Sequence, residues 1–207
     1  DLTGIRPTKI PMKLLEEGWK NTEIARYMRE TYGVSNEKTA LAITIANREK
    51  ALLQDLDYEN GYSLYVGIPF CPSICLYCSF GSHPLERWTK RVDEYLDTLC
   101  KELTFIREQM GARKLTTVYI GGGTPTTLEP EQLRRLLSHI QETFDFTWVK
   151  EYTVEAGRPD SITREKLQVM KEFPVTRISV NPQTMNQETL DVLGRKHTVE
   201  DTVNIFH

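Results

Sequence analysis

Residues 65–78 read YVGIPFCPSICLYC and contain three of the four cysteines of the chain. The residues that precede Cys71 favour extended backbone, so Ser63–Ile68 is predicted to be a strand. The cysteines follow this strand in a C-x3-C-x2-C spacing. Three thiolates on one loop can bind three irons of a 4Fe–4S cubane and leave the fourth iron open to a small molecule. The stretch therefore predicts a cluster bound by Cys71, Cys75 and Cys78.

A zinc site is the alternative use of the same thiols. Zinc needs a fourth ligand, and His83, five residues after Cys78, could provide it. Zinc sites of this kind usually carry paired C-x2-C clusters, and the sequence has no second pair. A zinc-stabilised interaction module is thus the weaker alternative. The fourth cysteine, Cys100, lies on the apolar side of a predicted helix and is expected to be a buried, inert thiol.

Outward from the cysteines, short strands alternate with amphipathic helices. Apolar residues recur every three or four positions over Val92–Met110, which predicts a helix. The helices that follow are predicted to start near Pro130, Thr163, Asn186 and Val199. The remaining strands are predicted at Leu115–Ile120, Glu151–Glu155 and Val175–Val180. This alternation predicts an α/β fold with a parallel sheet covered by helices.

Each predicted strand ends in residues suited to chemistry. The cysteines follow the first strand, Gly121–Gly123 the second and Gln183 the fourth, while Glu155 closes the third. In parallel sheets the chemistry lies at the carboxyl ends of the strands, so we expect these residues to meet there. Glu155 follows Val154 on a mainly apolar strand, where an unpaired carboxylate is costly. It is predicted to bind a polar ligand group or, alternatively, to form a structural salt bridge.

The first 60 residues have a different pattern and are predicted to be helical. Helix formers dominate Met12–Glu17, Thr22–Tyr32 and Glu37–Leu53. The segment is not expected to read DNA as a helix-turn-helix, because its nine Lys and Arg are balanced by ten Asp and Glu. We therefore predict two domains, an ancillary helical segment over residues 1–60 and an α/β core over residues 61–207.

The composition argues against several classes of protein. The net charge of −3 does not favour a nucleic-acid partner, and no apolar run is long enough to cross a membrane. Three cysteines within eight residues do not suit a secreted disulfide framework, so the reducing cytoplasm is the expected location. The chain starts at Asp1 without a methionine, and the sheet is expected to lack its last strands because the sequence stops at His207. We expect a piece of a longer protein.

Three stretches carry a resemblance to a known family. They are YVGIPFC at residues 65–71, YIGGGTPT at 119–126 and RISVNPQ at 177–183. Together they resemble the radical S-adenosylmethionine (SAM) superfamily and, within it, the oxygen-independent coproporphyrinogen III oxidases. The stretches 2–9 and 181–198 further resemble the HemZ branch, the coproporphyrinogen dehydrogenases. The resemblance covers nearly the whole chain and implies a partial (β/α) barrel of the radical SAM type.

The resemblance implies both the cofactors and the reaction. In this family SAM binds the open iron of the cluster, the reduced cluster donates an electron, and a 5′-deoxyadenosyl radical forms. The radical takes hydrogen from the propionate chains of coproporphyrinogen III. Loss of carbon dioxide and an electron then leaves the vinyl groups of protoporphyrinogen IX. The implied role is haem biosynthesis, with an electron donor and an electron acceptor that the sequence does not identify.

The resemblance also implies residues that contact SAM. Gly122 and Gly123 would let the backbone approach the methionine part of SAM, where a Cβ would intrude. Thr124 would lie beside the ligand. Glu155 would bind polar groups of SAM. For the glycines alone, the alternative is a tight turn from strand to loop.

Four further positions match the family. Gln183 and Arg195 match positions that contact a second SAM molecule, although a surface or helix-end arginine is the alternative at position 195. Tyr65 and Tyr77 match aromatic positions near SAM, with ordinary packing as their alternative. Tyr65 is the residue predicted to be catalytic.

Two departures from the family pattern bear on the substrate. Phe80 stands where the oxidase carries a further cysteine, two positions beyond the last cluster ligand. This Cys-x-Phe ending resembles the haem chaperone branch, which binds SAM and a cluster without decarboxylating coproporphyrinogen. Gly67 replaces a family histidine. The alternative function is therefore a haem carrier, with haem as the small-molecule ligand.

Overall fold

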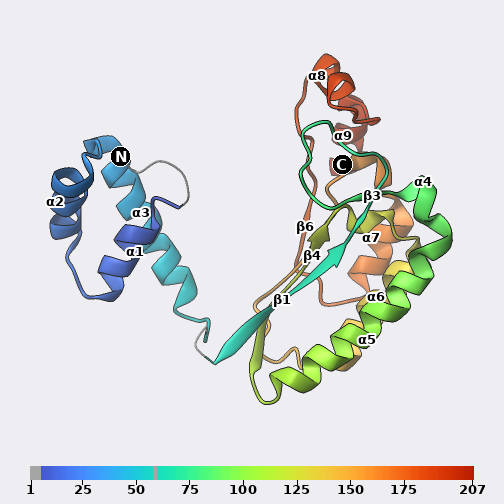
Figure 1. Cartoon of the computed structure of the whole chain (residues 1–207), viewed down its shortest axis with the longest axis horizontal. Helices are drawn as coiled ribbons and strands as arrows, with labels where there is room; N and C mark the ends of the chain where they lie inside the picture. Colours follow the sequence, from blue (N-terminus) through green and yellow to red (C-terminus); the bar gives the residue numbers. More distant parts are fainter. Residues whose placement is uncertain (1–5, 58–59) are drawn as a thin grey trace. The chain divides into compact units, whose positions relative to one another are not determined.

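The computed structural model of the chain describes residues 6–57 and 60–207 (Figure 1). The described residues form two compact units, one up to Asp57 and one from residue 60 onward. The first residues of the 2–9 motif lie outside the described part of the chain. Among the residues that are described, no helix is long and apolar enough to span a membrane.

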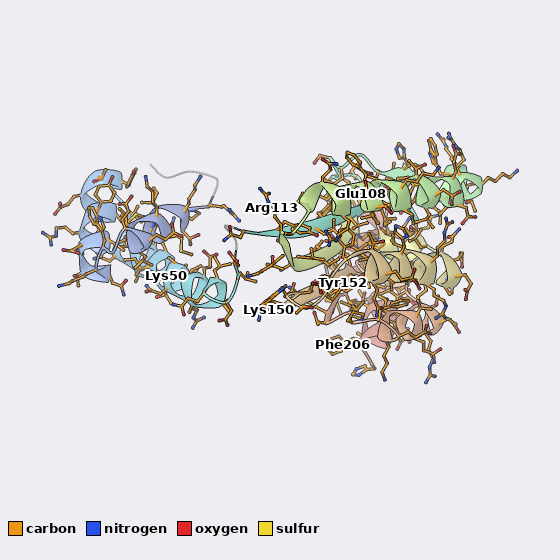
Figure 2. All side chains as sticks on the ribbon, turned by 90° about the horizontal axis from the view of Figure 1, so that it is seen from below. Lys50, Glu108, Arg113, Lys150, Tyr152 and Phe206 are labelled. Atoms are coloured by element: carbon orange, nitrogen blue, oxygen red, sulfur yellow. The ribbon has the colours of Figure 1, made fainter. Side chains whose placement is uncertain are left out.

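The first unit is helical. Its described residues form α1 (Lys9–Glu16), α2 (Asn21–Tyr32) and α3 (Asn36–Leu53), each of which begins slightly before the predicted segment. Ile24, Met28 and Ala46 lie in its buried apolar core. Lys50, which is labelled in Figure 2, donates a 2.8 Å hydrogen bond from Nζ to the carbonyl of Leu15 and so ties α3 to the end of α1.

The second unit is built around a parallel sheet. Within the described residues its strands are, in spatial order, β1 (Gly61–Ile68), β4 (Lys114–Gly122), β5 (Glu151–Glu155) and β6 (Arg177–Ser179). The helices between successive strands are α5 (Val92–Met110), α6 (Pro130–Thr143) and α7 (Arg164–Lys171), which lie on the same side of the sheet (Figure 1). The strand order never reverses, as in a (β/α) barrel and unlike a doubly wound sheet. The predicted α/β fold, a partial (β/α) barrel, is confirmed.

The helices pack on one side of the sheet because that side is apolar. Leu64, Val66 and Ile68 alternate along β1 with more exposed residues and are buried. Tyr152 of β5, labelled in Figure 2, is fully buried in the same core. The other strands and the helices contribute further apolar residues, among them Leu96, Leu103, Val118, Ile120, Leu133, Leu136, Leu137, Ile140 and Val154.

The opposite side of the sheet, which we call the inner face, carries polar, aromatic and glycine residues. Parallel pairing aligns Tyr65 with Tyr119, and Tyr119 with Thr153. Closer to the carboxyl ends, it aligns Gly67 with Gly121. The alternation along the strands assigns these residues to the inner face: Ser63, Tyr65, Gly67, Thr117, Tyr119, Gly121, Glu151, Thr153, Glu155, Arg177 and Ser179.

Two strands differ in length from the prediction. β4 continues through Gly122, beyond its predicted end at Ile120, because β1 continues to pair with it through Ile68. β6 is shorter than the predicted Val175–Val180. At its start, the side chain of Thr176 accepts a 2.8 Å hydrogen bond from Tyr152 N, where a regular strand would offer a backbone carbonyl.

Several short elements surround the second unit's main sheet. β2 (Phe70–Cys71) pairs with β3 (His83–Pro84), and α4 (Leu85–Trp88) follows; the sequence pattern predicts none of these three. Near the end of the chain lie α8 (Gln187–Val192) and α9 (Val199–Phe206). As predicted, Asn186 caps α8 by accepting a hydrogen bond from Thr189 N.

The prediction that Cys100 is buried is wrong, because its side chain is only partly buried on α5. This position lies where α5 meets α6, and His139 Nε2 is 2.8 Å from the carbonyl oxygen of Cys100. Partial burial raises the pKa of the thiol, which favours its protonated, unreactive form.

Candidate cofactor site

A cavity of about 320 Å³ lies at the carboxyl ends of the strands, where the sequence predicts the site. Ten of the eleven predicted site residues line it: Cys71, Cys75, Tyr77, Cys78, Gly122, Gly123, Thr124, Glu155, Gln183 and Arg195. The eleventh, Tyr65, is not among the lining residues. Phe80 also lines the cavity. Six further residues of the wall are not singled out by the sequence pattern: Ser73, Ser82, Gly157, Arg158, Ser179 and Asn181.

The cysteine loop, residues 71–78, presents three free thiols to this cavity. Cys71 ends β2 and is buried, whereas Cys75 and Cys78 are partly exposed. Cys78 N donates a 3.0 Å hydrogen bond to Cys75 O, and Leu76 N donates one of 3.1 Å to Leu193 O. The loop is therefore held both by its own turn and by a segment more than a hundred residues away in the sequence.

The donor set bears on which metal group the loop can take. Among the described residues, no three His, Cys, Asp or Glu side chains converge as one metal ion requires. His83, the candidate fourth zinc ligand, instead packs against Trp88 with tilted rings whose centroids are 4.9 Å apart, and it does not line the cavity. A 4Fe–4S cluster binds each cysteine through a different iron, so its thiolates stand farther apart than the ligands of one ion. Three thiols around one cavity fit a cluster better than zinc.

The glycines after β4 bring two backbones into close contact. Gly123 N donates a 2.7 Å hydrogen bond to Ile68 O. A Cβ on Gly123 would lie 2.7 Å from Phe70 O and 3.0 Å from Cys71 Sγ. Gly122 has φ of 105°, which strongly favours glycine, and a Cβ there would lie 3.0 Å from Ile68 N. Both positions thus need glycine because the backbone of residues 68–70 lies too close for a side chain. This requirement does not depend on a bound ligand.

Thr124 continues this contact on the cavity wall. Its amide donates a 2.8 Å hydrogen bond to Phe70 O, and its Oγ1 lies 3.5 Å from Cys71 Sγ. The side chain is only 2% exposed. Thr124 therefore contacts the thiol of a predicted cluster ligand directly.

Glu155 reaches the cavity from the last position of β5. The hydroxyl of Tyr119, on the neighbouring strand, donates a short hydrogen bond to Glu155 Oε1. This bond is the main cause that raises the pKa of Tyr119 to about 12. Gly121 leaves room for the arrangement, since a Cβ there would lie 3.0 Å from Glu155 Oε2. The carboxylate is thus oriented by a tyrosine while part of it faces the cavity.

The two predicted aromatic residues lie in different places. Tyr65 is 62% exposed on the inner face and stacks on Tyr119, with ring centroids 5.7 Å apart. Tyr77 lines the cavity beside Arg195. Burial raises the pKa of Tyr77, and the adjacent Arg195 opposes that rise. The structure thus associates Tyr77 with the cavity and Tyr65 with the neighbouring tyrosine of the sheet.

Gln183 and Arg195 meet through Asn181. Gln183 has φ of 64°, and its amide donates a 2.9 Å hydrogen bond to Asn181 Oδ1, which closes a tight turn. Arg195 is buried, and Nη1 donates a 3.2 Å bond to Asn181 O. Its Nε has no hydrogen-bond partner in the described part of the chain. A buried guanidinium N–H on a cavity wall suits a carboxylate or carbonyl group of a ligand.

The family model described as the radical SAM superfamily matches residues 65–207. The chain belongs to the radical SAM superfamily. The matched region includes β4, β5, β6 and all the cavity-lining residues described above.

Curated relatives of this radical SAM chain fall into two functional groups. The oxygen-independent coproporphyrinogen-III oxidase-like protein HemZ of Bacillus subtilis is 40% identical over 100% of this chain and 42% of its own length. The haem chaperone HemW of the same organism is 39% identical over 70% of this chain and 38% of its own length. The chain therefore spans less than half the length of these relatives.

A solved structure supports the same family. Coproporphyrinogen III oxidase (HemN) from Escherichia coli, described as a radical SAM enzyme, superimposes with a TM-score of 0.63. It is 28% identical to this chain, and the match covers 75% of this chain and 36% of that one. A coproporphyrinogen III oxidase thus has a fold similar to that of this chain.

Among the residues that the sequence pattern misses, Arg158 and Tyr119 have the most direct contacts with predicted site residues. Arg158 is buried on the cavity wall and contacts the cysteine loop. Its signal in the sequence is the run Arg158-Pro159-Asp160 between β5 and α7, in which an arginine and an aspartate flank a proline. Tyr119 lies two residues before the glycine triplet, on the same face as Gly121. Strand alternation alone could have placed it beside the site.

Proposed function

We propose that this chain is the cofactor-binding part of an oxygen-independent coproporphyrinogen III oxidase. The enzyme would convert propionate chains of coproporphyrinogen III into vinyl groups and so form protoporphyrinogen IX in haem biosynthesis. The supporting observation is that one cavity is lined by the three cysteines, the glycine pair, Glu155 and Arg195. The proposed substrate is the one that the names of two relatives indicate, since HemZ is named as an oxidase-like protein and HemN as the oxidase.

In the proposal, Cys71, Cys75 and Cys78 hold the 4Fe–4S cluster through three of its irons. When bound, the reduced cluster and SAM supply the radical chemistry that removes hydrogen from a propionate chain. Thr124 contacts the thiol of Cys71 directly, and the backbone at Gly123 packs close to the same thiol. The protein contributes position and shielding, while the cofactors contribute reactivity.

SAM would occupy the remainder of the cavity. Glu155, held by Tyr119, offers a carboxylate to the SAM amino group, and Arg195 offers its unpaired N–H to the SAM carboxylate. Gln183 lies next to Arg195 through Asn181. The proposal assigns these residues to SAM binding without dividing them between two SAM molecules. Tyr65 remains a proposed catalytic residue on the inner face.

A haem carrier is the second candidate, and a specific observation favours it. Phe80 stands where the oxidase pattern has a cysteine, and it lines the cavity with 70% of its surface exposed. The identity to the haem chaperone HemW is nearly as high as the identity to HemZ. An exposed aromatic side chain at the cavity mouth suits contact with a flat macrocycle. The cytoplasmic location is proposed for both candidates.

The two candidates are separated by a turnover assay together with a separate titration of the protein with haem. The protein at its natural full length is reconstituted anaerobically with iron and sulfide and given SAM, a reductant, an electron acceptor and coproporphyrinogen III. Protoporphyrinogen IX, 5′-deoxyadenosine and carbon dioxide are measured together, with the Cys75→Ala variant as control. Vinyl product that depends on Cys75 would support the oxidase. Stable haem uptake without vinyl product would instead support the carrier.

A further inference from the structure

Arg158 is a buried cation whose guanidinium contacts the cysteine loop. The residue is 3% exposed, and it lies in the segment between β5 and α7. Asp160 holds it in a bidentate ion pair, with bonds of 3.0 Å to Nε and 2.8 Å to Nη2. A fork–fork pair of this kind fixes the plane of the guanidinium. The remaining N–H groups of Arg158 therefore point in set directions.

Those directions lead to Ser73, in the middle of the cysteine loop. Arg158 Nη1 donates a 3.2 Å bond to Ser73 O, and Nη2 donates a 3.1 Å bond to Ser73 Oγ. The same hydroxyl donates a 2.9 Å bond to Gly194 O. Ser73 thus joins the turn after β5 to the segment before Arg195. Three parts of the cavity wall that are distant in sequence are connected through two side chains.

Arg158 also reaches a predicted cluster ligand. Nη1 lies 3.8 Å from Cys75 Sγ, within hydrogen-bonding range for sulfur. When a cysteine binds iron, its sulfur carries negative charge, and hydrogen bonds to it shift the reduction potential of the cluster. A fixed positive charge at this place stabilises the reduced cluster more than the oxidised one, because the reduced form carries one more negative charge.

We propose that Arg158 is a positioning residue that orders the cysteine loop through Ser73 and raises the reduction potential of the cluster through Cys75. The inference rests on the proposed function, since it takes the cysteines to hold a cluster. The proposed function assigns no role to Arg158, and the inference supplies one. An arginine that only paired with Asp160 for stability would affect neither loop order nor potential selectively.

The first test measures the potential. The full-length protein is reconstituted anaerobically, and iron, sulfide and the midpoint potential are determined without SAM by a redox titration followed by electron paramagnetic resonance. Arg158→Gln is expected to lower the midpoint potential. Arg164→Gln, which removes the same charge from an exposed position on α7, is expected to leave it unchanged. Ser73→Ala keeps the contact with Cys75 and is expected to retain the wild-type potential.

The second test needs no cluster. Hydrogen exchange of the iron-free protein is followed by mass spectrometry over residues 71–78 and 193–195. Arg158→Gln and Ser73→Ala are expected to speed exchange in these two segments and to leave β1, β4 and β5 protected. Wild-type protein that takes up no iron would overturn the proposed function and the effect of Arg158 on the potential, whereas the exchange test would still decide whether Arg158 orders the cysteine loop.

Three outcomes would overturn the inference about Arg158. The first is an Arg158→Gln protein with a full cluster and the wild-type potential. The second is unchanged exchange of the cysteine loop in that variant. The third is exchange that rises over the whole sheet, which would make Arg158 a general structural residue. Arg158→Lys keeps the charge but loses the two-pronged hydrogen bonding of the guanidinium, so it is expected to speed exchange of the cysteine loop and to lower the potential less than Arg158→Gln does.

Discussion

Tyr119 donates its hydroxyl hydrogen to Glu155 across two neighbouring strands of the sheet. The bond orients a carboxylate that would otherwise be free to rotate at the end of β5. Gly121 leaves the space in which the carboxylate lies, and Tyr65 stacks on the other side of the same ring. The carboxylate therefore reaches the cavity in one orientation, prepared before any ligand binds.

The stability contributed by this bond should depend on pH. The pKa of Tyr119 is about 12 in the folded protein against an ordinary value of 10, so the bond stabilises the fold fully below pH 10. The contribution is lost as the pH rises from 10 through 12, because the unfolded chain gives up the proton first. At pH 8, Tyr119→Phe should lower the melting temperature by roughly 3 °C. Calorimetric scans at several pH values should show that this difference shrinks above pH 10, and a constant difference would contradict the assignment.

The glycine after Gly122 should not tolerate a methyl group. Gly123→Ala would bring Cβ to 2.7 Å from Phe70 O, so the cysteine loop must shift. We expect a loss of about 1–3 kcal/mol in the free energy of unfolding, together with reduced iron after reconstitution. Gly157→Ala is the matched control, since Gly157 lines the same cavity and a Cβ there meets nothing within 4 Å. Equal effects of the two substitutions, measured by denaturant unfolding and iron analysis, would count against the close contact.

Cys75 and Cys100 should differ in their effect on iron binding, because only Cys75 is a proposed cluster ligand. Cys75→Ala should remove most of the iron and the brown absorbance of the reconstituted protein, because the cluster loses one of three protein ligands. Cys100→Ala should leave both unchanged, since this thiol lies on α5 and does not line the cavity. Iron and sulfide per chain are the measurements. Loss of iron in the Cys100 variant would show that the cluster site has been assigned wrongly.

Arg195 should govern the affinity for SAM. Arg195→Lys keeps the charge but loses the N–H that has no partner in the described structure. We expect SAM to bind about tenfold or more weakly, as for the loss of a hydrogen bond to a charged group. Equilibrium dialysis of the reconstituted protein measures this, with the exposed Arg164→Lys as control. Wild-type affinity in Arg195→Lys would exclude the residue from the SAM site.

The spacing of apolar residues predicts most of the fold, because each helix buries a single apolar side against the sheet. The helices over Val92–Met110 and from Pro130 bury one apolar side each, and that side is visible in sequence spacing. The rest depends on contacts that spacing does not contain. β2 and β3 form only because Phe70 and Cys71 are brought beside His83 and Pro84 by the loop between them. The exposure of Cys100 likewise depends on the packing of α5 against α6.

The candidate site was open to prediction to a similar extent. The strand ends predict that the cysteines, the glycine triplet, Glu155 and Gln183 meet at one edge, and all of these except Gly121 line the cavity. The sequence does not predict the role of Arg158, because an arginine in a turn is usually a surface residue, whereas this one is 3% exposed and bonded to Ser73 and Asp160. Tyr65 was expected beside the cofactors, and its place against Tyr119 follows from strand pairing that no motif reveals.

The backbone bonds from Gly123 to Ile68 and from Thr124 to Phe70 extend the pairing of β1 and β4 beyond the sheet. The two loops are therefore one interlocked piece, and neither can be exchanged without the other. A chimaera that receives only the cysteine loop of a related protein should misplace its thiols. A chimaera that receives both loops together should keep them aligned. The cysteine motif and the glycine motif should therefore be inherited together, because the geometry of each depends on the other.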